Sequence, residues 1–127
     1  MKGIVDSGGR SLVTVALRSN QQPTEMQIDV WIDTGFTGDL VIPQSVIDTL
    51  GLPRSGSIDA VLADGSQTEL NTYSCVIEWF GHERNLEVIA NEGAFPLLGV
   101  GLLLGLELWV DYRNFKLTLE PALFEST

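Results

Sequence analysis

One short segment of the chain places a carboxylate beside two hydroxyls and a glycine. Asp33, Thr34, Gly35 and Thr37 stand between an alternating apolar segment and the short apolar run 40–42. This pattern predicts a loop between two strands, with Asp33 at the end of the first. Gly35 permits a tight turn and the close approach of another chain. The hydroxyls of Thr34 and Thr37 can hold the loop in place through hydrogen bonds. A carboxylate held in this way is rigid yet reachable, as acid–base chemistry requires.

The residues around this loop decide between a turn and a catalytic site. An isolated Asp-Thr-Gly is more often an ordinary turn in which the aspartate accepts hydrogen bonds from its own loop. The whole stretch 30–43, VWIDTGFTGDLVIP, however, resembles the catalytic segment of the retropepsin-like aspartic proteases, in particular their bacterial single-domain members. The resemblance implies that Asp33 is catalytic. It also implies an active-site loop that contacts the substrate through Thr34, Gly35, Phe36 and Thr37.

Two further segments carry the same resemblance. Leu97, Leu98 and Gly99 begin 64 residues after Asp33, and in this family two apolar residues and a glycine form a ψ-shaped crossing with the catalytic loop. The hairpin signal Asp64-Gly65 suits the flap that covers the family's cleft, so the resemblance implies a flap at Ala63, Asp64 and Gly65. The closing segment 108–119 is also typical of the bacterial members, and the resemblance spans residues 12–120.

The resemblance also has departures. Phe36 stands where alanine or serine is commonest in the family, and its ring can shape or narrow the cleft. The hairpin at 63–65 has a single glycine where better-known members have several. The implied fold is all-β, a closed or partly open acid-protease barrel with one or two short helices.

Peptide hydrolysis by carboxylates needs two of them, because one must be charged while the other carries a proton. The chain has one convincing copy of the site. Asp6-Ser7-Gly8 lacks a preceding strand, and Asp64-Gly65-Ser66 lacks the motif's middle residue. We therefore expect a homodimer with its two-fold axis at the Asp33 loops. The resemblance implies that Thr34 bonds across this axis and that the substrate is a peptide or an unfolded protein.

Other functions remain open at this point. The same fold can serve as a catalytically silent dimerisation or peptide-binding module, since a motif alone does not prove turnover. A cysteine hydrolase built on Cys75 and His82 is disfavoured, because strand residues seven apart point to opposite faces. One His and one Cys cannot make a closed zinc site, so we expect neither a metal nor a cofactor.

The elements that must position Asp33 are short strands separated by turn signals. Strands are predicted over 11–18, 25–33, 40–42, 58–62, 67–70, 71–80, 85–90, 106–112 and 115–120. Helical spacing predicts one helix over 43–50, between Pro43 and Gly51, and a helical turn over 102–104. This arrangement indicates a β-sandwich or barrel.

Length and composition limit the remaining choices. The chain has 127 residues, which indicates a single domain spanning 1–127. A net charge of −10 with seven scattered basic residues argues against a nucleic-acid partner. The apolar run 94–106 is too short to cross a bilayer and is interrupted by Pro96 and three glycines, so we expect a buried core segment and no membrane partner. Without a secretory signal at the N-terminus, we expect a cytoplasmic protein.

Overall fold

The computed structural model describes residues 1–92 and 95–122. Residue 94 of the predicted apolar run, and residues 93 and 123–127 of the predicted domain, lie outside the described residues. The chain is mostly β-structure, which confirms the predicted all-β class. Its elements are β1 (Lys2–Val5), β2 (Ser11–Arg18), β3 (Glu25–Ile32), β4 (Leu40–Pro43), α1 (Gln44–Leu50), β5 (Arg54–Val61), β6 (Gln67–Trp79), β7 (His82–Asn91), β8 (Leu97–Leu98), α2 (Val100–Leu103), β9 (Leu106–Asp111) and β10 (Lys116–Pro121).

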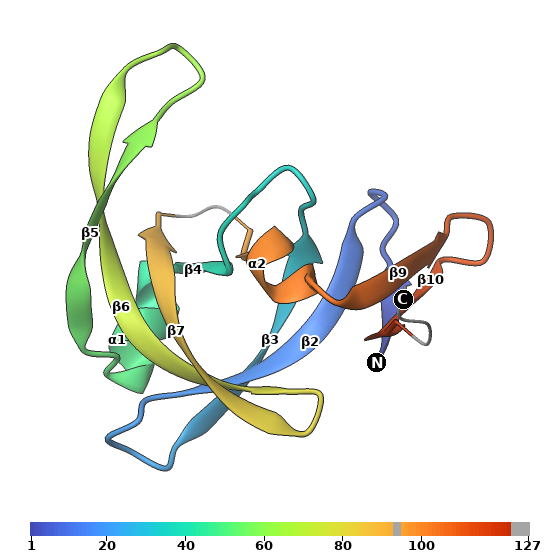
Figure 1. Ribbon diagram of the computed structural model, residues 1–127, viewed down its shortest axis with the longest axis horizontal. Helices are drawn as coiled ribbons and strands as arrows, with labels where there is room; N and C mark the ends of the chain where they lie inside the picture. Colours follow the sequence, from blue (N-terminus) through green and yellow to red (C-terminus); the bar gives the residue numbers. More distant parts are fainter. Residues whose placement is uncertain (93–94, 123–127) are drawn as a thin grey trace, which may run out of the picture.

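Six of the strands form a closed circuit of hydrogen-bonded neighbours. The sheet order runs β5-β6-β7-β4-β8-β3-β2-β1-β10-β9, and an additional pairing joins β2 back to β6. The circuit is therefore β6–β7–β4–β8–β3–β2 and back to β6, which is a small barrel. Beyond it, β5 pairs only with β6 in a long hairpin, and β1, β10 and β9 extend from β2 on the other side (Figure 1). Closure leaves the circuit itself without a free strand edge.

The barrel closes because alternate side chains of its strands are apolar. On β2, Val13, Val15 and Leu17 are buried, while Thr14 between them is exposed. On β3 the same alternation buries Val30 and leaves its neighbours more exposed. Burying one such side chain contributes about 1.5–3 kcal/mol relative to leaving it in water. Helix α1 packs its buried Ile47 and Leu50 against this core and ends at Gly51, whose φ of 63° suits glycine.

The structure differs from the predicted elements in several places. The two strands expected over 67–70 and 71–80 are one 13-residue strand, β6, because pairing with β5 and then β7 continues along it without a break. Strand β5 begins at Arg54 rather than at residue 58. Strand β1 corrects the expectation that the five residues before Asp6-Ser7-Gly8 are too few for a strand; it ends directly before Asp6 and pairs with both β2 and β10.

The apolar run after residue 94 packs mainly into the core over its described part. Leu98 and Leu102 are 0% and 1% exposed, whereas Leu104 is 76% exposed. The predicted helical turn is present but begins earlier, at Val100. Among the described residues, no helix has the length and apolar character that a membrane crossing requires.

Leu98 and Leu104 offer a matched test of this core. Because Leu98 is fully buried in the middle of the circuit, we expect Leu98→Ala to lower the free energy of unfolding by about 2–5 kcal/mol. Leu104→Ala makes the same substitution at an exposed position and should change the free energy of unfolding by less than about 0.5 kcal/mol. Urea unfolding followed by circular dichroism measures both values. Equal losses in the two variants would contradict the buried position of Leu98.

Candidate active site

The two strands that flank Asp33 are held apart by a third, β8. Strand β8 pairs in parallel with β3, where Trp31 is opposite Leu97, and antiparallel with β4, where Leu40 is opposite Leu98. The chain thus leaves β3, forms the Asp33 loop, returns as β4, and much later inserts β8 between them. This is a ψ-shaped crossing, and it places Asp33 directly above the inserted strand.

Main-chain hydrogen bonds fix the position of Asp33. Its N–H donates to the Leu98 carbonyl at 2.8 Å, which continues the pairing of β3 with β8 by one residue. The Gly35 N–H donates to Asp33 Oδ1 at 2.9 Å, and the Phe36 N–H donates to the Asp33 carbonyl at 3.2 Å. Asp33 is therefore half-buried, with one carboxylate oxygen anchored by its own loop as in an Asx turn.

The rest of the loop is joined to the segment after β8 by three hydrogen bonds. The Val100 N–H donates to the Phe36 carbonyl at 2.7 Å, the Gly99 N–H to the Asp39 carbonyl at 2.8 Å, and the Gly101 N–H to the Gly38 carbonyl at 3.0 Å. These contacts are close because glycine lacks a Cβ. A Cβ on Gly99 would lie 2.2 Å from the Gly38 carbonyl oxygen, a distance that real atoms do not adopt.

Two hollows lie on either side of this loop. The first, of about 290 Å³, is lined by Trp31, Ile32, Asp33, Thr34 and Leu97. The second, of about 590 Å³, separates the β5–β6 hairpin from β4 and β7 and is called the hairpin cleft below. It is lined by Phe36, Val41, Gln44, Ile58, Ala60, Glu69, Leu70, Asn71, Ile89, Ala90, Asn91 and Glu92. The two hollows share no residue, and Phe36 is the member of the Asp33 loop that reaches the cleft.

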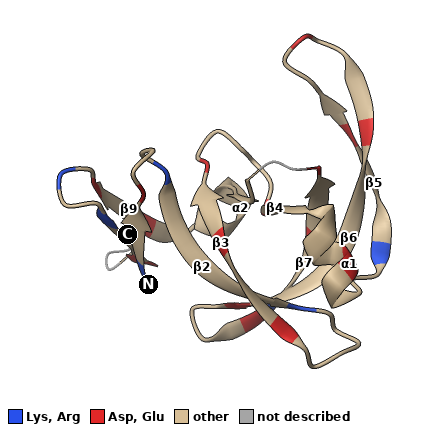
Figure 2. Cartoon of the chain, turned by 180° about the vertical axis from the view of Figure 1, so that it is seen from behind, with Lys and Arg blue, Asp and Glu red and all other residues tan. Residues whose placement is uncertain are grey.

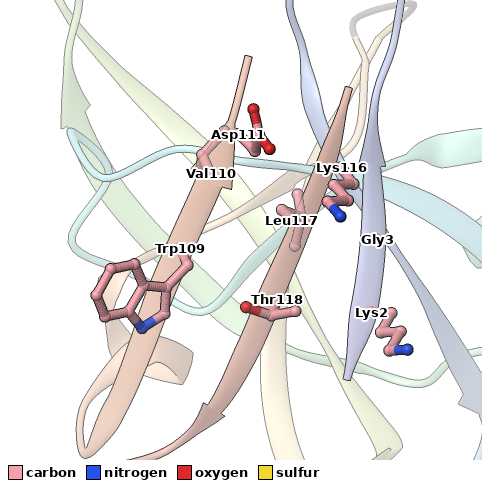
Figure 3. Close-up of a pocket in the computed structure, with 8 residues that line it drawn as sticks. All are labelled: Lys2, Gly3, Trp109, Val110, Asp111, Lys116, Leu117 and Thr118. Carbon is pink, nitrogen blue, oxygen red and sulfur yellow. The ribbon is translucent and has the colours of Figure 1, made fainter. Parts of the chain in front are cut away.

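A third hollow, of about 370 Å³, lies away from the first two, beside the N-terminus of the chain. Strands β1, β9 and β10 line it, and Figure 3 shows Trp109 and Lys2 on opposite sides of it, with Lys116 and Thr118 on the strand between them. It contains none of the residues that the sequence assigned to the active site. Charged residues are spread over the molecule: Figure 2 shows Lys and Arg near the two termini and also on β5.

The sequence-predicted site residues lie in three separate places. Thr34 is exposed and lines the Asp33 hollow, as expected of a loop that meets another chain. Gly35 and Thr37 are exposed on the same loop, whereas Phe36 turns toward the hairpin cleft. Leu97 lines the Asp33 hollow, and Leu98 and Gly99 are buried beneath the loop.

The predicted flap residues Ala63, Asp64 and Gly65 form the tip of the β5–β6 hairpin, which stands apart from the β3–β4 loop in Figure 1. None of them lines either hollow. The Ser66 hydroxyl and N–H donate to Asp64 Oδ1 at 2.6 and 2.9 Å and lower the pKa of that carboxyl. The stem of the hairpin lines the cleft instead. Ile58 and Ala60, alternate residues of the predicted strand 58–62, are the part of the sequence that could have indicated this.

A cluster beside the Asp33 hollow was not predicted from the sequence. The Arg10 guanidinium lies 4.3 Å from the Phe95 ring centre and 5.9 Å from that of Trp31, within cation–π range. Its Nε also donates to Asp6 Oδ2 at 2.9 Å. Hydrogen bonds from Arg10, foremost that of its main-chain N–H, lower the pKa of Asp6. Asp6-Ser7-Gly8 is therefore an anchored turn rather than a second catalytic loop.

The geometry does not support chemistry at Cys75 and His82. Cys75 is buried opposite Leu86, whereas His82 is exposed opposite Trp79. Desolvation raises the pKa of the Cys75 thiol to about 11, so it stays protonated at neutral pH. Within residues 1–92 and 95–122, no three His, Cys, Asp or Glu side chains lie together in a way that could hold a metal ion.

Comparison with solved structures assigns the fold. The chain is similar to a retropepsin-like aspartic protease from Rickettsia conorii, with a TM-score of 0.63 and 16% identity over 96% of this chain and 91% of that one. It is also similar to the EIAV protease complexed with the inhibitor HBY-793, with a TM-score of 0.55 and 17% identity over 77% and 88% of the two chains. No family model and no curated protein matches the chain. At these identities the likeness establishes a shared fold.

The close packing at Gly99 gives a direct test of the loop. We expect Gly99→Ala to lower the free energy of unfolding by about 1–3 kcal/mol, because the added methyl overlaps the Gly38 carbonyl. Gly8→Ala is the matched control, since a Cβ there meets only Asp6 Oδ1, at 3.5 Å. Thermal and urea unfolding of both variants measure the difference. A Gly99→Ala variant as stable as Gly8→Ala would show that the loop and the β8 segment are not in contact.

The buried thiol gives a second test. At pH 8 a thiol with a pKa near 11 is ionised in only about one molecule in a thousand, so iodoacetamide should leave Cys75 unmodified in the folded chain. The same reagent should label the urea-unfolded chain completely, which serves as the control. Mass spectrometry reads out both states. Rapid labelling of the folded chain would contradict the burial of Cys75.

Proposed function

We propose that this chain, which has the retropepsin-like fold, is an aspartic endopeptidase that works as a homodimer. The observation that carries the proposal is the placement of Asp33 at the ψ-shaped crossing, where its N–H bonds the Leu98 carbonyl and its carboxylate remains half-buried. In this position β8 supports Asp33 rigidly, while the carboxylate stays accessible on its other side. A group that must contact a substrate and a second carboxylate needs both.

The proposed reaction uses two Asp33 carboxylates, one from each subunit. Two close carboxylates cannot both ionise easily because like charges repel, so the pair shares one proton. The ionised member removes a proton from a water molecule, and the oxygen of that water attacks the peptide carbonyl carbon. The protonated member supports the carbonyl oxygen as it gains charge, and a proton is then delivered to the leaving amine. The two carboxylates exchange roles, and the shared proton is restored.

Features of the single chain support assembly into a dimer. Thr34, Gly35 and Thr37 are exposed around Asp33, so a second copy of the loop can approach without displacing a side chain from the core. Each subunit has a net charge of −10, so the interface must supply attraction that offsets this repulsion. Large apolar side chains are available near the chain ends, since Leu104 is 76% exposed, Trp109 66% and Tyr112 63%.

The substrate proposed for this enzyme is an extended peptide or an unfolded protein. The hairpin cleft is open along the inner face of β5 and β6, and apolar side chains form most of that face. A peptide lying there would place alternate side chains into the cleft and present its backbone to the Asp33 pair. Asp33 is the one carboxylate among the residues that line the Asp33 hollow, whereas Glu69 and Glu92 line the cleft. The proposed activity therefore depends on Asp33.

Asp33→Asn is the decisive variant. It keeps the size and most hydrogen bonds of the side chain but removes the ionisable group, so we expect hydrolysis of a denatured protein to fall by about 10²–10⁴-fold. Sedimentation velocity should show a dimer for both the wild type and the variant. Asp59→Asn, which changes an exposed carboxylate on β5, should retain full activity. Peptide release is followed by mass spectrometry at mildly acidic pH.

Three results would contradict the proposal. Unchanged hydrolysis by Asp33→Asn would exclude the carboxylate mechanism. A wild-type chain that stays monomeric at high micromolar concentration while it cleaves would exclude the shared site. A dimer that binds peptides but cleaves none would identify the chain as a silent peptide-binding module.

A further inference from the structure

The hairpin cleft has one apolar face that four strands build together. Val41 on β4 and Thr72 on β6 are both paired with Ile89 on β7, so the three side chains project from the same side of the sheet. Leu70 is two residues before Thr72 and is paired with Ile58 on β5, so this pair continues the same face along the hairpin. Val41, Ile58, Leu70 and Ile89 therefore give the cleft an aliphatic face, and the polar residues Gln44, Glu69, Asn71, Asn91 and Glu92 complete its lining.

Phe36 lies at one end of this face and packs closely against the neighbouring backbone. A Cβ built on Gly38 would lie 2.5 Å from the Phe36 Cζ atom, and one built on Gly99 would lie 2.5 Å from its Cδ2 atom. The ring therefore rests against two residues that have only hydrogen at the point of contact. Both ends of its backbone are also bonded, since its N–H donates to Asp33 and its carbonyl accepts from Val100.

The same ring stands next to the proposed catalytic group. Of the residues that line the hairpin cleft, Phe36 alone belongs to the Asp33 loop, three residues away along the chain. The Asp33 hollow and the cleft have no residue in common, and Phe36 comes from the loop between them. A substrate side chain that enters the cleft beside the scissile bond must therefore fit against this ring.

We infer that Phe36 determines the size of the substrate side chain that the cleft accepts beside Asp33. The inference rests on the proposed peptide-binding function and adds a residue that selects among peptides. Because the ring packs against Gly38 and Gly99, it occupies space at this end of the cleft that a large side chain would need. The cleft then accepts aliphatic side chains such as Val, Ile and Leu at that position and excludes Phe, Tyr and Trp. A shorter residue at 36 would leave a space about the size of a benzene ring, which an aromatic side chain can fill.

Binding rather than cleavage gives the sharpest test. The probe is a positional-scanning set of fluorescent octapeptides, each with one defined residue, titrated by anisotropy against Asp33→Asn so that no turnover occurs. At the peptide position with the strongest side-chain preference, we expect peptides with Leu to bind about tenfold more tightly than peptides with Phe. A tenfold ratio is typical when two side chains differ by this much in size in an apolar pocket. In Asp33→Asn/Phe36→Ala the preference should reverse at that position only. Asp33→Asn/Phe115→Ala, which removes an exposed aromatic outside the cleft, should keep the original order.

The possible outcomes separate this inference from the proposed function. Peptide binding with the same side-chain order in the Phe36→Ala background would overturn the role of Phe36 and leave the protease proposal intact. Binding without cleavage by the wild type would overturn the protease proposal, while a reversed order in Phe36→Ala would still support the inference. If no peptide binds to any of the proteins, the inference is overturned.

A stability measurement tests the ring position without any ligand. Gly38→Ala in the wild-type background should lower the midpoint of urea unfolding, because its methyl meets the Phe36 ring. In the Phe36→Ala background the same change should have little effect, since the ring is gone. This double-mutant cycle should show a coupling between the two positions. Additive effects would show that the ring does not lie on Gly38 and would remove the basis of the inference.

Discussion

The structure depends on strand β8, whose two residues, Leu97 and Leu98, pair with β3 on one side and with β4 on the other. These hydrogen bonds close the barrel between β3 and β4, which are otherwise connected only the other way around the circuit, through β7, β6 and β2. They also carry Asp33, whose N–H extends the ladder to the Leu98 carbonyl. The fold and the site are therefore stabilised by the same contacts, so the loss of Leu98 affects the carboxylate as well as the core.

Glycine makes this arrangement possible at the loop. The Asp33 loop and the segment after β8 approach so closely that Gly99 and Gly101 have backbone or carboxylate oxygens where a Cβ would stand. The rigidity that acid–base chemistry needs thus arises from main-chain contacts rather than from a network of polar side chains. In the proposed homodimer, a second subunit would meet a surface whose shape is already set, which lowers the entropic cost of assembly.

Much of this fold could be predicted from the sequence, because alternation, Pro43 and the glycines act locally. The helix at α1, the strands before and after Asp33 and the closing hairpin all follow from such signals. Features set by distant contacts could not be predicted. The continuity of β6 depends on its two partners, and the Arg10 cluster depends on Phe95, 85 residues away. The orientation of Phe36 needed the positions of both Gly38 and Gly99.

Strand β6 belongs to the barrel at one end and to the hairpin at the other. No flexible linker divides these parts, but the register of β5 against β6 shifts between Arg54 and Gly56, where the Ser55 hydroxyl lies 3.0 Å from the Thr72 hydroxyl. A bulge of this kind bends a strand while the remaining ladder stays intact. The bulge at Ser55 therefore lies where the hairpin meets the barrel, and β6 connects the hairpin tip to the barrel wall as a single continuous strand.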